Sequence, residues 1–239
     1  QNFSLTVEGY YKTMNNIIGY KEGASFLAIQ ESDEGLESIS WEENVTSGKG
    51  TSYGAEVLLQ RKQGRLTGWA GYTLSWTTHQ FDELNNGKKF FARYDRRHDI
   101  SLVGVYELKE NITLSATWVY GTGNAITLPI STYQTSELSN VSSPSRDNFY
   151  RANGTEYTDR NAFRMRAYHR ADIGVQVMKQ KKSGVRTWEF SVYNSYNRKN
   201  PFYYFIGSEE QFNPDSKQVL KQVSLFPILP SVSWNFKFN

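Results

Sequence analysis

Few residues of this chain have the types and spacing that catalysis or tight ligand binding requires. The segment Gly48-Lys49-Gly50-Thr51-Ser52 sets a lysine and two hydroxyl groups among glycines, which is the composition of a phosphate-binding loop. Such a loop holds phosphate on the amides of a helix N-terminus, whereas this segment leads into residues that alternate in polarity as a strand does. We therefore interpret it as a flexible entry into a strand, because glycines are ordinary turn residues.

The three histidines, His79, His98 and His169, are far apart in sequence, and none has a second potential ligand at a metal-binding spacing. His98 and His169 each stand beside arginine and aspartate where an expected strand ends. We interpret the basic residues at these two places as a solvated, charged rim: Arg96, Arg97, His98, His169 and Arg170. The alternative is contact with the phosphate groups of a ligand or a lipid, for which arginine is well suited.

Several carboxylates occupy the polar positions of the expected strands, together with basic residues such as Lys12 and Lys237. This mixture of charges suits the water-facing wall of a lumen better than a catalytic pair. They are Glu8, Glu56, Glu107, Asp172 and Glu189. The chain has no cysteine, and we find no Ser–His–Asp order and no metal-ligand cluster. We therefore predict that the protein is not an enzyme and carries no cofactor.

The elements that position these residues are strands. Apolar and polar residues alternate along the whole chain, and no segment has convincing helical periodicity. We expect eight strands at about 2–18, 51–62, 66–76, 98–108, 112–121, 168–178, 185–205 and 218–238. The connections alternate between tight turns (63–64, 109–111, 180–184) and long segments (19–50, 79–97, 122–167, 206–217). Short turns at one rim and long loops at the other are typical of bacterial outer-membrane barrels, in which the short side is periplasmic.

The last expected strand gives the strongest indication. From Val232 to Phe238 it alternates polar residues with apolar ones that are mostly aromatic. An apolar aromatic face of this kind is a liability in water but forms the outer wall of a barrel in a bilayer. We predict that Trp234, Phe236 and Phe238 face lipid and that this strand guides assembly. The alternation slips near Pro227 and Pro230, which we interpret as a β-bulge.

Composition permits this interpretation. The chain has 239 residues, 38% hydrophobic residues, 15% aromatic residues and a mean hydropathy of −0.62. No run approaches the ~18 apolar residues of a transmembrane helix, but in barrel strands only every second residue meets lipid. The formal net charge of +3 is too small to indicate a nucleic-acid partner.

A series of short stretches carries a family resemblance: Val7-Glu8-Gly9-Tyr10-Tyr11-Lys12, Tyr53-Gly54-Ala55-Glu56-Val57, Gly68-Trp69-Ala70-Gly71-Tyr72, Asp95-Arg96-Arg97-His98-Asp99, Trp118-Val119-Tyr120-Gly121, Tyr168-His169-Arg170-Ala171-Asp172 and Tyr193-Asn194-Ser195-Tyr196-Asn197-Arg198-Lys199-Asn200-Pro201. In their order and spacing they resemble the C-terminal barrel of TonB-dependent outer-membrane transporters. That family has a 22-stranded barrel plugged by an N-terminal domain. The resemblance implies an all-β, antiparallel, transmembrane β-barrel in which residues 1–239 supply eight up-and-down strands, the last eight of the 22. The N-terminal plug and the earlier strands would lie outside this sequence.

The resemblance also implies a function: active import of a scarce ligand, such as a siderophore, metal chelate, cofactor or oligosaccharide, with energy supplied through TonB. The implied location is the outer membrane of a Gram-negative bacterium, with the C-terminus periplasmic. The implied partners are outer-membrane lipid and lipopolysaccharide, the TonB complex through the missing N-terminal part, a surface lipoprotein, and the small-molecule or oligosaccharide ligand.

The long segment 122–167 is where we expect ligand contact, because aromatic side chains among polar ones can stack on and hydrogen-bond a sugar or chelate. Its candidate residues are Tyr133, Phe149, Tyr150 and Tyr157, which could equally pack the loop itself. Two other functions stay open. One is a self-contained eight-stranded outer-membrane barrel with a structural or adhesion role, and the other is a soluble lipocalin-like carrier with its apolar residues inward.

Overall fold

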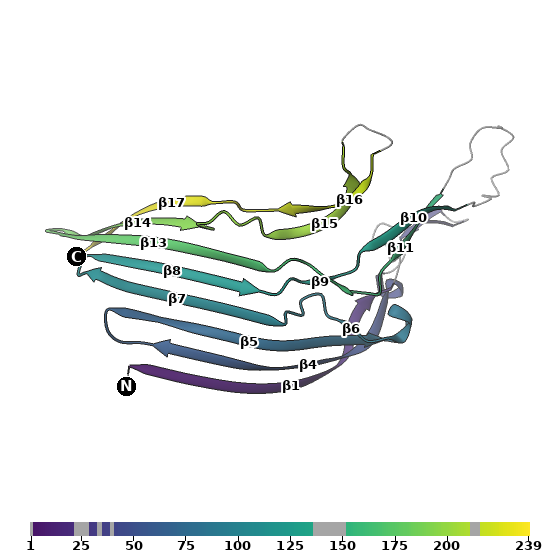
Figure 1. Cartoon of the computed structure of the whole chain (residues 1–239), viewed down its shortest axis with the longest axis horizontal. Helices are drawn as coiled ribbons and strands as arrows, with labels where there is room; N and C mark the ends of the chain where they lie inside the picture. Colours follow the sequence, from purple (N-terminus) through teal and green to yellow (C-terminus); the bar gives the residue numbers. More distant parts are fainter. Residues whose placement is uncertain (1, 22–28, 33–34, 39–40, 136–151, 211–215) are drawn as a thin grey trace.

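The structure is a computed structural model that describes residues 2–21, 29–32, 35–38, 41–135, 152–210 and 216–239 (Figure 1). Apart from the short 3-10 helices η1 (Trp41–Asn44) and η2 (Asn85–Gly87), the regular elements in these ranges are strands. No helix in the described ranges is long and apolar enough to cross a membrane.

Eight long strands form one antiparallel sheet in the order β1-β4-β5-β7-β8-β13-β14-β17, and the short β6 (Phe90–Phe91) pairs with the side of β5. The long strands are β1 (Phe3–Tyr20), β4 (Val45–Arg61), β5 (Leu66–Phe81), β7 (His98–Lys109), β8 (Ile112–Gly121), β13 (Tyr168–Lys181), β14 (Gly184–Tyr193) and β17 (Leu229–Phe238). Each long strand pairs with the next long strand along the chain. The prediction of an all-β, antiparallel, up-and-down fold of eight strands is therefore confirmed.

The two ends of the sheet differ as the sequence predicted. Tight turns join β4 to β5, β7 to β8 and β13 to β14 at the end where both termini lie, which we call the turn end (Figure 1). The long connections lie at the opposite, loop end, where they form small two-stranded sheets. These pair β2 (Ile29–Ser32) with β3 (Gly35–Ser38), β9 (Ala125–Ile126) with β12 (Phe163–Arg164), β10 (Pro129–Thr135) with β11 (Ala152–Tyr157), and β15 (Pro201–Ser208) with β16 (Gln218–Ser224).

Two expected strands are interrupted, which corrects the sequence analysis. The expected strand 185–205 ends at Tyr193, and its remainder is β15, which pairs with β16 outside the main sheet. Asn194 and Asn197 have φ values of 52° and 54°, a left-handed conformation that asparagine tolerates and that takes the backbone out of the extended conformation. The expected strand 218–238 also divides, into β16 and β17, and the predicted bulge is a break with Phe226 at φ 56°.

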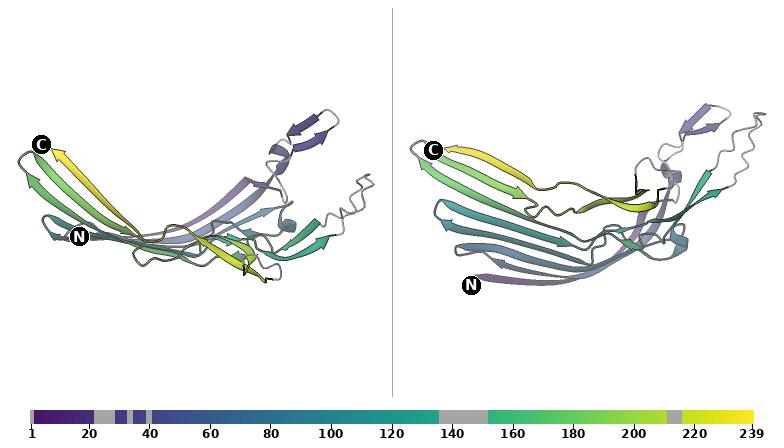
Figure 2. Two further views of the ribbon diagram at one scale, coloured as in Figure 1. Left: turned by 90° about the horizontal axis from the view of Figure 1, so that it is seen from above. Right: turned by 45° about the horizontal axis from the view of Figure 1, so that its top comes forward.

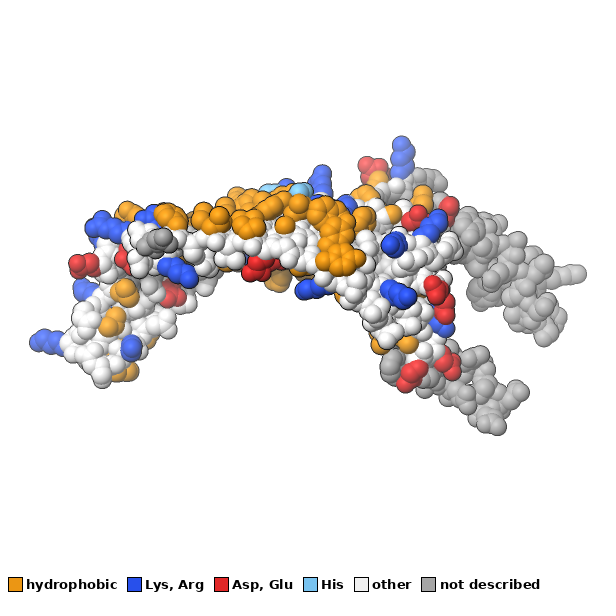
Figure 3. All heavy atoms as spheres, turned by 90° about the horizontal axis from the view of Figure 1, so that it is seen from below, with side chains coloured by type: hydrophobic (Ala, Val, Ile, Leu, Met, Phe, Trp, Pro, Cys, Tyr) orange, Lys and Arg blue, Asp and Glu red, His pale blue; other side chains and the backbone are white. Residues whose placement is uncertain are grey.

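The strand register gathers the apolar side chains on one face of the sheet. Tyr11 pairs with Tyr53, and Tyr53 with Trp76; their rings stack with centroids 6.3 and 5.2 Å apart. Farther along, Leu102 lies between Ala70 and Trp118 on the same face. The sheet is arched (Figure 2), and Figure 3 shows hydrophobic side chains along its convex side.

The opposite, concave face is polar. Glu8 lies directly across from Glu56, and Ser52 hydrogen-bonds Thr77 at 2.9 Å. Gln176 donates to Glu189 at 2.8 Å. This division confirms the predicted assignment of faces and matches a barrel wall with lipid outside and water inside.

The apolar face has the dimensions of a membrane-spanning band. Between its aromatic ends the band is nine residues long on two separate strands, counting both ends: Phe3 to Tyr11 on β1 and His98 to Tyr106 on β7. A transmembrane β-strand needs about 9–11 residues. At the turn end, Trp234, Phe236 and Phe238 form a contiguous row with neighbouring centroids 6.4 and 4.8 Å apart.

The sheet is open, and its side chains do not enclose a central hydrophobic core. In the described chain β1 pairs only with β4 and β17 only with β14. Large apolar side chains stay exposed on it, including Tyr11 at 70% and Phe238 at 76%. The described buried apolar cluster consists of Phe81, Leu84 and Phe90, with Ile17 against it, at the loop end.

If the apolar face lies against lipid and Leu102 is near the bilayer midplane, we expect Leu102→Arg to reduce folding stability in lipid by about 2–4 kcal/mol, because it places a cation on that face. Ser101→Arg puts the same side chain on the polar face of the same strand and should cost far less. Folding titrations into lipid vesicles measure both, and equal losses would contradict the assigned faces.

We also expect the double change Phe236→Ala and Phe238→Ala to lower the amount of assembled protein, because it removes two rings from the apolar end of β17. The matched control is Ser233→Ala with Asn235→Ala, which alters the polar face of the same strand. Heat-modifiable protein in outer-membrane fractions is the readout. Normal levels in the aromatic variant would refute an assembly role for these rings.

Candidate functional site

The loop end holds the candidate site. There, side chains bond backbone groups that a neighbouring strand would otherwise pair. β5 pairs with β7 only as far as Leu74, so the backbone beyond it needs other partners. Ser75 N–H donates to the Arg97 carbonyl at 3.1 Å, and Thr77 N–H donates to a carboxylate oxygen of Asp95. Farther along, the short strand β6 pairs with β5 at Thr78 and His79, so these contacts bridge the gap between the pairings with β7 and with β6.

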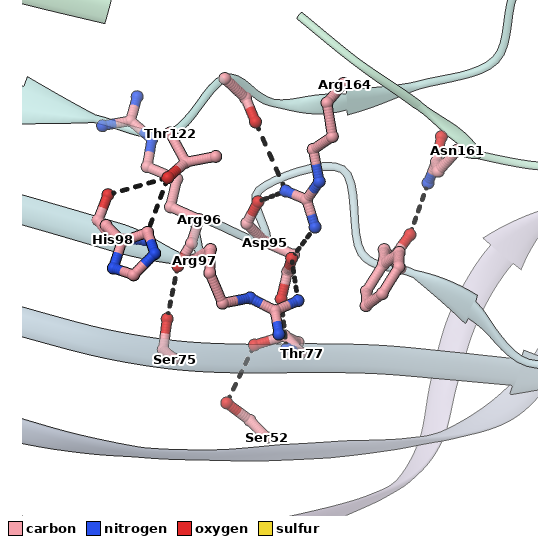
Figure 4. A network of polar contacts seen from close by, with 12 residues as sticks. Ser52, Ser75, Thr77, Asp95, Arg96, Arg97, His98, Thr122, Asn161 and Arg164 are labelled. Carbon is pink, nitrogen blue, oxygen red and sulfur yellow. Dashed lines mark hydrogen bonds and ion pairs between the residues drawn. The ribbon is translucent and has the colours of Figure 1, made fainter. Parts of the chain in front are cut away.

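Asp95 is the centre of this arrangement (Figure 4). Its side chain is fully buried and accepts from the Arg164 guanidinium, while Arg97 lies 3.6 Å away on the same carboxylate oxygen. The Arg164 guanidinium also donates to the Asp95 carbonyl. A buried carboxylate requires such partners, because an unpaired buried charge is strongly destabilising. The contact ties β12 to the segment between β6 and β7.

Aromatic rings flank the two arginines. The Arg97 guanidinium carbon lies 4.4 Å from the Trp76 ring centroid and 5.5 Å from that of Phe91. The Arg164 guanidinium carbon lies 4.9 Å from the Phe91 centroid. These distances lie in the range of cation–π interactions, so both cations have charge and ring partners already.

A second cluster of side chains lies beside β13 and takes the place of a neighbouring strand there. Asn200 makes two hydrogen bonds with the backbone of His169, accepting at 3.0 Å and donating at 2.9 Å, as a neighbouring strand would. Asn194 is 1% exposed; its amide donates to the carbonyls of Arg198 and Phe226, and its backbone N–H donates to Asp172. The segment 194–200 is thereby fixed against the end of the sheet.

The structure places His98 and His169 at the loop end of the apolar face. His98 Nδ1 forms a 2.9 Å hydrogen bond with the Tyr72 hydroxyl, and His169 Nδ1 forms one of 2.8 Å with Tyr196. The Tyr120 ring stacks on His169, with centroids 6.4 Å apart. Tyrosines with one apolar side and one polar tip are typical of membrane–water interfaces.

The other predicted rim residues make ion pairs. Arg96 contacts Asp99 at 3.2 Å, and Arg170 contacts Asp172 at 3.0 Å. Arg170 also donates to the Tyr193 hydroxyl at 2.6 Å and lies 4.0 Å from that ring's centroid. The five predicted rim residues therefore share one end of the sheet, but they do not converge on one point.

The third histidine, His79, lies three residues beyond Trp76, past the apolar band. Its ring makes edge contacts with Phe81, Phe90 and Tyr94. Burial lowers the pKa of His79, because desolvation disfavours the charged imidazolium. In the described part of the chain, no three histidine or acidic side chains lie close enough together to hold a metal ion.

Two adjoining cavities open among the loop-end segments. One has a volume of about 520 Å³, between the segment 126–129, the segment 160–165 and the hairpin β15–β16. The other, of about 420 Å³, lies between the segments 85–91 and 159–162, and both are lined by Arg160 and Asn161. Ligand sites in proteins have volumes of about 300–1,000 Å³, so each cavity is large enough for a small molecule.

The predicted ligand-contact residues have different outcomes. Tyr133 lies in β10 opposite Gly154, and Tyr157 ends β11 with 59% of its surface exposed. Phe149 and Tyr150 lie outside the described residues. Tyr157 is not among the described residues that line the two cavities, and the role of all four in ligand binding stays a prediction.

The residues that organise the site were missed in the sequence. Asp95, Asn194 and Asn200 stand inside two of the stretches that carry the family resemblance, but their roles depend on backbone groups far away in the chain. No sequence pattern marked Arg160 and Arg164 as part of a site, because they lie in a long segment that was expected to be irregular.

Comparison with known proteins adds little. No family profile and no curated protein sequence matches the chain. Among solved structures, the ferripyoverdine receptor of the outer membrane of Pseudomonas aeruginosa, bound to ferripyoverdine, is similar with a TM-score of 0.46 and 11% sequence identity. The match covers 84% of this chain and 22% of the receptor. A similarity this distant does not identify the function or the ligand of this chain.

We expect Asp95→Asn to destabilise the loop end by about 3–5 kcal/mol, because it leaves the arginines around it without a counter-charge. Asp99→Asn is the matched control, since Asp99 forms an exposed pair worth about 0–1 kcal/mol. The midpoint of heat modification and the rate of proteolysis at the loop end measure the difference. Equal behaviour of the two variants would contradict a central role for Asp95.

Proposed function

We propose that the protein is part of an outer-membrane receptor that imports a scarce ligand with energy supplied through TonB. The observation that carries this proposal is the division of one arched sheet into a convex apolar face about one membrane thick and a concave polar face. A sheet divided in this way fits a barrel wall, with lipid on one side and an aqueous lumen on the other.

The two open edges support a larger ring. Unpaired strand edges are not tolerated in lipid, because each unsatisfied backbone group costs several kcal/mol. β1 and β17 do not pair with each other in the described sheet, which disfavours a self-contained eight-stranded barrel. We propose that further strands of a longer chain cover both edges, as in a 22-stranded barrel. In this arrangement the turn end, with the C-terminus, faces the periplasm.

The loop end supports the receptor role. Its cavity of about 520 Å³ combines apolar and aromatic walls, such as Leu128, Phe202 and Tyr204, with polar groups at Arg93 and Asn161. Binding pockets for small molecules have this combination of apolar walls and a few polar groups. We propose that this cavity contributes to ligand capture on the outer surface, and that the classes to test are siderophores, other metal chelates, cofactors and oligosaccharides.

Uptake by cells tests the proposal. Cells that express the native protein should accumulate at least one labelled ligand of these classes, and deletion of TonB should abolish that uptake. Tyr204→Ala should reduce uptake by removing a ring from the cavity wall, whereas Tyr106→Ala, on the apolar face near the turn end, should not. Uptake that continues without TonB, or that admits any small solute, would refute active transport.

A further inference from the structure

Basic side chains gather around the two loop-end cavities. The larger cavity is lined by Arg93 and Arg160, and the smaller one by Lys88, Lys89 and Arg160. The acidic side chain on their linings is Asp159, on the smaller cavity. Taken together, the two linings carry four basic groups and one acidic group among the described residues.

These cations differ from the other loop-end arginines in their partners. Arg96, Arg97, Arg164 and Arg170 are each held by a carboxylate. Arg93 and Arg160 form no ion pair with any described residue. An arginine without a counter-charge on the wall of a cavity is available to an anionic group, and its planar guanidinium suits carboxylate and phosphate.

Arg160 is also held in position before any ligand arrives. Its backbone N–H donates to the Asn85 side chain at 2.9 Å, and its guanidinium carbon lies 5.4 Å from the centroid of the Phe90 ring. The next residue, Asn161, is also fixed: its backbone N–H donates to the Thr127 hydroxyl at 3.0 Å. Its side-chain amide donates to the Phe91 carbonyl at 2.8 Å (Figure 4). Preorganisation of this kind reduces the entropy lost on binding.

The opposite wall of the larger cavity is apolar. Phe202, Ile206 and Leu220 come from the hairpin β15–β16, and Leu128 and Met165 come from the segments facing it. A ligand that reaches Arg93 and Arg160 therefore also contacts aliphatic and aromatic surface.

We propose that these cavities bind an anionic ligand that carries a phosphate or carboxylate group on an apolar or aromatic body, with Arg93 and Arg160 holding the anion. This inference names the ligand class of the cavity in the proposed function and rests on that function. The same chemistry is found in a soluble anionic solute and in the phosphorylated headgroup of an outer-leaflet lipid, so the experiment must distinguish the two sources.

The test measures binding by the purified full-length protein in neutral detergent, at two salt concentrations. The soluble probes are pyrophosphate and citrate, and the lipid probe is lipid A, compared with the same lipid after removal of its phosphates. We expect at least one probe to bind, with an affinity that falls as salt rises. Arg93→Gln with Arg160→Gln should weaken that binding at least tenfold.

Arg65→Gln is the matched control, because it removes the same charge from an exposed arginine beside a tight turn at the other end. If the double variant fails to become heat-modifiable, Arg93→Gln alone carries the test, since Arg93 is exposed. Loss of pyrophosphate or citrate binding supports a soluble ligand, and loss of binding to phosphorylated lipid A alone supports a lipid. No binding by any probe, or equal loss in the Arg65 variant, overturns the proposal. Because uptake is not the readout, the proposed transport function can fail or stand independently of this result.

Discussion

The constraint on which the rest of the structure depends is the pairing of backbone N–H and C=O groups. The protein is a single curved sheet whose large side chains stay exposed, so packing around a central core contributes little to holding its strands together. The ladder between neighbouring strands does that instead, over long registers such as β1 with β4 and β4 with β5. In the proposed membrane setting the ladder is obligatory, because no water is present in lipid to replace a missing partner.

Where the ladder stops, side chains continue it. Asp95 accepts from the backbone of β5 beyond its pairing with β7, and Asn200 bonds both backbone groups of His169 beyond the pairing of β13 with β14. In both places a side chain stands in for the backbone of a neighbouring strand. Both lie at the loop end, where the strands separate and the cavities are found. The sheet therefore opens into irregular loops while the backbone groups of Thr77 and His169 keep their partners.

The sequence predicted the wall far better than the site. Alternation fixes which side chains share a face, so the apolar and polar faces followed from it. The tight turns followed from the short segments between the alternating ones, and the up-and-down order of the strands was implied by the family resemblance. Alternation failed at residues 194–200, a polar segment that was expected to continue a strand, and at residues 225–228, where apolar residues continue although the strand is broken. The signal that was available is the three asparagines at 194, 197 and 200, since asparagine tolerates a left-handed backbone and can imitate a peptide group.

The site itself depends on contacts that no local pattern encodes. Arg164 meets Asp95 across 69 positions of sequence, and Arg160 meets the Asn85 side chain across 75. Composition could show that the loops contain arginines, but it could not separate arginines that hold the fold from arginines left available to a ligand. The structure makes that distinction by burial and pairing: Arg97 and Arg164 neutralise a buried carboxylate, while Arg93 and Arg160 line a cavity. Neutralising the first pair should therefore disturb the fold, whereas neutralising the second should leave the fold intact and change only what the protein binds.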